Sequence, residues 1–158
     1  MGREGNALLR GADPAQVADE LDRLFCYHML ASNWALGVRN RLEGQPLYLL
    51  NDELEQVHER NLTSALALAY RVAELGGAVT VDPAAMLRQA SLETVELPDC
   101  ADLGSILGMA LARTRTAIRT YGQVLDRTAG DELSRVLLLE LLRHEVARES
   151  DLEAAGAR

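Results

Sequence analysis

The chain has 158 residues, of which 24 are acidic and 16 basic, so its formal net charge is −8. We expect residues 1–158 to form one globular domain, because a chain of this length buries a core without a disulfide or metal. The negative charge argues against nucleic-acid binding, since affinity for a phosphate backbone comes from Lys and Arg side chains. No stretch of 18 residues lacks charge, which argues against a membrane span. With only Cys26 and Cys100, a disulfide framework is not expected, and we predict a cytoplasmic protein.

The first predicted helix covers residues 14–43. Asp13 is a favourable N-cap, and Pro14 fits the first helical position. Apolar side chains from Val17 to Leu42 recur mostly every three or four residues, which is the period of one helix face. The run Gly44-Gln45-Pro46 then stops the helix. Its acidic side chains are expected to be solvated, namely Asp19, Glu20 and Asp22.

The second predicted helix covers residues 47–75 and stops at Gly76-Gly77. Because only a short turn separates it from the first, the two helices should lie antiparallel. Residues 78–101 lose the periodicity except in a short helix over 84–90, and they are long enough to cross a bundle. Two further helices are predicted over 103–129 and 131–155, separated at Gly130-Asp131. The prediction is an all-α fold, a four-helix bundle with one long crossover between the second and third helices, which is the ferritin-like arrangement.

Three sequence phrases carry a family resemblance. They are Leu68 to Gly77, Ala117 to Tyr121, and Gly130-Asp131 through Leu152. In their order and spacing the chain resembles ferritin-like proteins over nearly its whole length, in particular the bacterioferritin and Dps-like branches. The resemblance implies an iron centre held by one Glu on each of the first and third helices and by Glu-x-x-His on each of the second and fourth.

Most of that ligand set is absent from this sequence. The resemblance implies a ligand position on each of the four helices. These positions are occupied by His28 on the first helix, Asn61 and Ser64 on the second, Thr116 on the third, and Glu145 and Arg148 on the fourth. One carboxylate of the expected four remains, so Asn61, Ser64 and Thr116 are vacated ligand positions. Bacterioferritins hold haem through a Met that corresponds here to Leu62, so no haem is expected.

Glu145 is the most informative of these residues, because an ionised carboxylate inside a bundle is costly unless it is paired. Arg148 lies one turn later on the same helix, and Arg113 lies one turn before Thr116. We therefore expect an internal ion pair of Glu145 with Arg148 or Arg113 in place of a metal.

A displaced metal site is the alternative. A literal Glu-x-x-His occurs at Glu55 to His58, six residues before the place implied by the resemblance. His58 shares the inward stripe of Asn61, so a metal site could be built from His28, His58 and Glu145. A third possibility is that the vacated centre is a pocket for a small ligand.

Three functions follow from these alternatives. The first is a structural or assembly subunit without ferroxidase activity, catalytic residues or cofactor, which forms a homodimer or larger homo-oligomer or joins an active ferritin-like homologue. The second is an iron-binding or iron-storage protein with an atypical site, whose activity, if any, would be ferroxidase-like. The third is a small-ligand binder or enzyme that uses the centre of the bundle.

Overall fold

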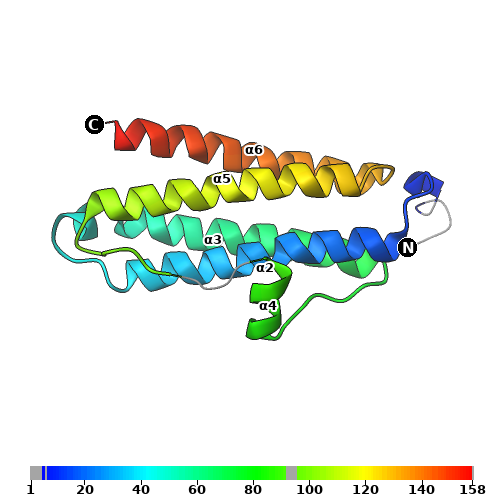
Figure 1. Ribbon diagram of the computed structural model, residues 1–158, viewed down its shortest axis with the longest axis horizontal. Coiled ribbons are helices and arrows are strands. Elements are labelled where there is room, and N and C mark those ends of the chain that lie inside the picture. Colours follow the sequence, from blue (N-terminus) through cyan, green and yellow to red (C-terminus); the bar gives the residue numbers. More distant parts are fainter. Residues whose placement is uncertain (1–4, 6, 92–95, 158) are drawn as a thin grey trace.

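Four long helices and no strands make up the part of the chain that the computed structural model describes, residues 5, 7–91 and 96–157 (Figure 1). The long helices are α2 (Pro14–Arg39), α3 (Gly44–Glu74), α5 (Leu103–Arg127) and α6 (Glu132–Gly156). A 3-10 turn, η1 (Ala7–Leu9), precedes them, and a short helix, α4 (Pro83–Gln89), lies in the connection from α3 to α5. The predicted all-α bundle with its long crossover is confirmed. No helix among these residues is apolar over a length that would cross a membrane.

Antiparallel pairs form the bundle: α2 packs along α3, and α5 packs along α6 (Figure 1). Because α3 and α5 run in the same direction, the chain must return along the whole bundle between them. The described parts of this connection, residues 75–91 and 96–102, follow that return, and α4 packs against α2.

Aspartate side chains begin most of the helices. Asp13 accepts a hydrogen bond from the Ala15 N–H at 3.0 Å, and Asp102 accepts one from the Gly104 N–H at 3.0 Å. These caps satisfy backbone donors that have no partner inside the helix. The α2 helix ends at Arg39 and α3 begins at Gly44, so the connection is longer than the predicted turn. Pro46 lies inside the first turn of α3, where its missing N–H costs nothing.

The predicted stop after α3 is confirmed and has a specific cause. Gly76 adopts φ +83°, and the N–H groups of Gly76 and Gly77 donate to the carbonyls of Ala73 and Val72 at 3.0 and 2.9 Å. This is the Schellman arrangement, which favours glycine. A Cβ atom on Gly77 would lie 2.9 Å from the Cβ of Ala18, so the glycine also lets the end of α3 approach α2.

The core consists of two apolar clusters. One contains Leu21, Leu68 and Tyr121, and the other contains Trp34 and Ile106. Buried polar side chains lie along the helices where one cluster gives way to the other: Ser32 on α2, Asn61 on α3, Thr114 on α5 and Glu145 on α6. The fold therefore places a polar layer at mid-height in the bundle.

The crossover is fastened to α2 by two buried side chains. Asp22 accepts hydrogen bonds from the N–H and hydroxyl of Thr80, at 2.8 and 2.7 Å. The indole N–H of Trp34 donates to the Glu96 carbonyl at 3.0 Å. The expectation that Asp22 is solvated is therefore wrong, because a loop distant in sequence supplies its donors.

Candidate functional site at the centre of the bundle

A chain of hydrogen bonds crosses the polar layer through His28. Its Nδ1 lies 2.8 Å from Oδ1 of Asn61, and its Nε2 lies 2.7 Å from the hydroxyl of Tyr121. The Asn61 amide donates to the Val57 carbonyl at 2.8 Å, which fixes Oδ1 as the atom that faces His28. A neutral His28 then donates from Nδ1 and accepts the Tyr121 proton at Nε2.

The surroundings keep this histidine neutral. Burial lowers the pKa of His28, and the nearby Arg148 lowers it further, while Glu145 and the Asn61 hydrogen bond act in the opposite direction. Burial likewise raises the pKa of Tyr121 well above its usual range. The three side chains therefore form a neutral and fully bonded link between α2, α3 and α5.

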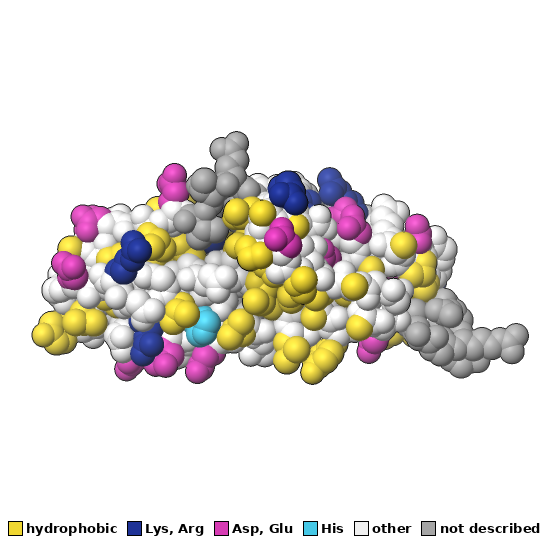
Figure 2. Space-filling model, turned by 90° about the horizontal axis from the view of Figure 1, so that it is seen from below, with side chains coloured by type: hydrophobic (Ala, Val, Ile, Leu, Met, Phe, Trp, Pro, Cys, Tyr) yellow, Lys and Arg dark blue, Asp and Glu magenta, His cyan; other side chains and the backbone are white. Residues whose placement is uncertain are grey.

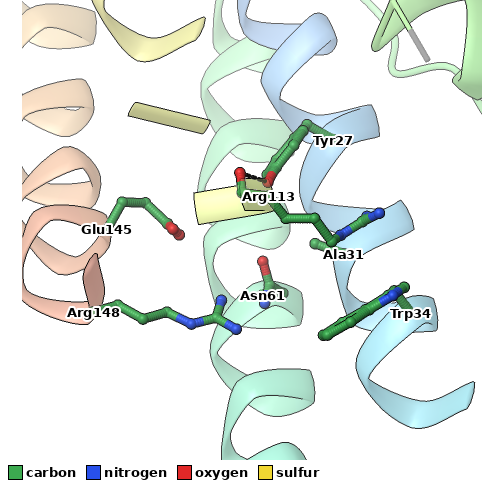
Figure 3. A pocket seen from close by; sticks show the side chains of 7 residues that line it. All are labelled: Tyr27, Ala31, Trp34, Asn61, Arg113, Glu145 and Arg148. Carbon is green, nitrogen blue, oxygen red and sulfur yellow. Dashed lines mark hydrogen bonds between the residues drawn. The ribbon is translucent and has the colours of Figure 1, made fainter. Parts of the chain in front are cut away.

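Charged side chains surround a small cavity beside this link (Figure 3). Its volume is about 10 Å³, the lower limit for one water molecule. The Glu145 carboxylate points into it from α6, and Arg148 extends from the same helix toward Asn61 and Trp34. The Arg113 guanidinium lies over the Trp34 ring, 5.3 Å from its centroid.

The predicted ion pair of Glu145 is not formed. No Arg or His nitrogen among the described residues lies within 4.0 Å of its carboxylate. Arg113 is held elsewhere, by Trp34, and one of its buried nitrogens, Nη2, has no hydrogen-bond partner in the described structure. Burial accordingly lowers the pKa of Arg113.

The structure does not bring His28, His58 and Glu145 together. Nδ1 of His58 lies 2.7 Å from the hydroxyl of Ser32 and 3.1 Å from its carbonyl, whereas His28 bonds to Asn61 and Tyr121. Within residues 5, 7–91 and 96–157, no three His, Cys, Asp or Glu side chains are grouped so that they could hold a metal ion.

The other two vacated positions lie outside the buried centre. Ser64 is half-buried on the side of α3 that faces α6. Thr116 is half-buried and donates to the Ala112 carbonyl of its own helix at 3.0 Å. On α5 the residue that reaches His28 is instead Tyr121.

Sequence reasoning missed Tyr121 and Tyr27 as members of the centre. The buried positions of α5 include Ala110, Thr114, Ala117, Tyr121 and Val124, whose spacing of four and three residues marks one face. That spacing would have selected Tyr121 over Thr116. Tyr27 donates to the Arg113 carbonyl at 2.6 Å, and burial raises its pKa to about 12.

A sequence model of the ferritin-like domain matches residues 18–156 of the chain. The chain belongs to the ferritin-like family. No curated protein sequence matches it.

Solved structures of this family share the fold. A dodecameric thioferritin from Bacteroides fragilis is 23% identical with a TM-score of 0.84, covering 97% of this chain and 92% of its own. A Dps protein from Vibrio cholerae is 16% identical with a TM-score of 0.82, and the match covers 90% of this chain and 89% of the Dps chain. The bacterioferritin of Desulfovibrio desulfuricans is 18% identical with a TM-score of 0.78, and the match covers 99% of this chain and 84% of the bacterioferritin chain.

The residues at the centre do not fit the di-iron group of ferritin-like proteins. Such a group needs several carboxylates to neutralise two iron ions. Here Glu145 is the one carboxylate that lines the central cavity, and two guanidinium groups line it as well. Both nitrogens of His28 are engaged in hydrogen bonds. The donor set of this ferritin-like chain favours a polar core over a metal centre.

Proposed function

We propose that this protein is a ferritin-like subunit without a ferroxidase centre, which serves as a structural or assembly component. The observation that carries the proposal is the bonded link of Tyr121, His28 and Asn61, which uses the ring nitrogens that a metal would need. The two guanidinium groups beside Glu145 support it, because their charge has the same sign as that of iron.

The proposed assembly face is the outer side of α2 and α3. Three leucines there are partly exposed: Leu36 (37%), Leu62 (39%) and Leu66 (52%). Leu62 and Leu66 lie on the same side of α3 as Glu55, which forms an ion pair with Arg39 of α2. Figure 2 shows apolar side chains spread over this face of the molecule. The thioferritin relative is dodecameric, which supports a homodimer or larger homo-oligomer here, or assembly with an active ferritin-like homologue. The unpaired state of Cys26 and Cys100 agrees with a cytoplasmic location.

Ferrous iron tests the proposal. Protein purified without chelator is incubated anaerobically with ferrous iron and then exposed to air, while iron oxidation is followed by absorbance and bound iron by elemental mass spectrometry. We expect oxidation no faster than in buffer alone and bound iron at background.

Bound iron near one equivalent or more per chain would contradict the proposal and favour the iron-binding alternative. Glu145→Gln and His58→Ala would then tell whether the displaced site holds it. Loss of iron in both variants, with the helical circular dichroism unchanged, would identify that site.

A further inference from the structure

A groove between α3 and α6 opens next to the central cavity. Its volume is about 650 Å³, and small-molecule sites usually occupy roughly 300–1,000 Å³. Part of its wall is apolar, formed by Val57, Ala67, Leu137 and Leu141. Three polar residues line both the groove and the central cavity, namely Asn61, Glu145 and Arg148. The groove therefore combines an apolar wall with a charged inner end.

The charges at that inner end have no protein partner among the described residues. Glu145 is only 8% exposed, and no described residue gives its carboxylate a hydrogen bond or an ion pair. Its oxygens are not among the buried atoms that lack a partner, so the carboxylate is accessible from the groove that it lines. Figure 3 shows this carboxylate pointing toward the space where Asn61 lies.

Arg148 is in the same condition. It is half-buried, and its guanidinium has no hydrogen bond or ion pair with a described residue. Glu145 and Arg148 lie one turn apart on α6, where an ion pair would be easy to form, yet their charged atoms are more than 4.0 Å apart. Two opposite charges thus face one space without neutralising each other.

We propose that this groove binds a small zwitterion with an apolar body, of the class of the aliphatic α-amino acids. Glu145 accepts hydrogen bonds from the ammonium group, and the Arg148 guanidinium donates to the carboxylate. The apolar body lies against Val57, Leu137 and Leu141. A simple amine would leave Arg148 unpaired and a simple carboxylate would leave Glu145 unpaired, so both ligand charges are needed. The inference is independent of the iron test.

The test compares leucine with two analogues that each keep one charge, isopentylamine and 4-methylpentanoate, in calorimetric titrations of the full chain. Because each charge-assisted hydrogen bond adds to the binding affinity, we expect leucine to bind at least about tenfold more tightly than either analogue. In Glu145→Gln, leucine should bind no better than 4-methylpentanoate. In Arg148→Gln, it should bind no better than isopentylamine.

Glu132→Gln and Arg143→Gln are the matched controls, since both side chains are exposed on the same helix and neither lines the groove, and they should leave leucine affinity unchanged. If a variant of Glu145 or Arg148 fails to fold, N-acetylleucine and leucine methyl ester test the same two contacts on the unaltered protein, and both should bind at least about tenfold more weakly than leucine. No binding of leucine, or equal binding of leucine and a one-charge analogue, would overturn the proposal.

Discussion

At the centre of the bundle, the His28 side chain must satisfy two ring nitrogens away from water. Asn61 and Tyr121 do so only while the ring is neutral, because a protonated ring presents two donors and Nε2 would lose the proton that it accepts from Tyr121. The stability of the fold is therefore linked to the protonation of one residue.

The pH dependence of unfolding tests this link. Burial holds the pKa of His28 below its ordinary value of 6.5, so the unfolded chain binds the proton more readily. The contribution of neutral His28 to the free energy of unfolding is fully present above pH 6.5. It is lost as the pH falls toward the lowered native pKa, by up to about 1.4 kcal/mol per pH unit. We expect the free energy of unfolding, measured by urea titration, to fall less steeply below pH 6.5 in His28→Gln. Parallel curves for the two proteins would contradict the assignment.

His28 and Asn61 could be predicted to lie at the centre from sequence, because each was counted along a helix from a glycine that ends or begins it. Counting from a glycine misplaced the position on α5, since Thr114, Thr116 and Thr120 offer the same chemistry at neighbouring positions, and only the spacing of the buried face selects Tyr121. The ion pair of Glu145 failed for another reason. Spacing along a helix gives no information on the partner that Arg113 finds across the bundle, which is the Trp34 ring.

Between elements, the end of α3 is joined to the start of α6 by a buried ion pair. Arg71 Nη2 donates to both carboxylate oxygens of Asp131 at 2.9 Å, and Arg71 Nε donates to the Ser134 hydroxyl at 3.0 Å. Burial alone would raise the pKa of Asp131, but the hydrogen bonds from Ser134 and Arg71 outweigh it and lower the pKa. Asp131 also caps α6 by accepting the Ser134 N–H, so one side chain fixes both the helix start and its attachment.

Asp131→Asn isolates the ion pair, because asparagine is an equally good N-cap. The substitution removes the buried carboxylate from Arg71, which keeps its ion pair with Glu74 at 2.8 Å, so we expect a loss of roughly 2 kcal/mol in the free energy of unfolding at pH 7. The lowered pKa of Asp131 means that this contribution is present above its ordinary value of 3.8 and is lost as the pH falls through the native pKa. Urea titrations at pH 7 and below pH 4 measure both effects.

Asp82→Asn is the control for that change, since Asp82 caps α4 through the Ala85 N–H and has no charged partner in the described structure. Asp82→Asn should lower the free energy of unfolding at pH 7 much less than Asp131→Asn does. Equal losses for the two variants would mean that the capping bond, and not the ion pair, carries the effect.

Helix ends were the most predictable elements, because Asp13, Gly76 and Asp131 act through local backbone geometry. Arg71 and Asp22 were not predictable in this way. Each lies on a helix near an exposed charged residue, Glu74 or Asp19, and each is buried because a distant segment, the start of α6 or Thr80, supplies its partner.

Over the whole molecule, exposed apolar side chains occur on more than one face. The α3 helix carries Leu62 and Leu66 one turn apart and α2 carries Leu36, while the exposed apolar side chains of α6 are Leu133, Val136, Leu139 and Val146. Adjacent exposed apolar residues are typical of interfaces. In the proposed assembly, the leucines of α2 and α3 are the ones expected to be sensitive to substitution, because affinity depends on a few well-buried residues.

The double variant Leu62→Glu, Leu66→Glu tests the assembly face. Charged side chains there would have to be desolvated in an interface, so we expect dissociation to monomers in light scattering coupled to gel filtration, with at least about a tenfold loss of affinity. Val136→Glu introduces one negative charge at an exposed apolar position of α6 and should leave the oligomer intact. If Val136→Glu dissociates the oligomer and the double variant does not, the interface lies on α6 and the proposed assembly face is wrong.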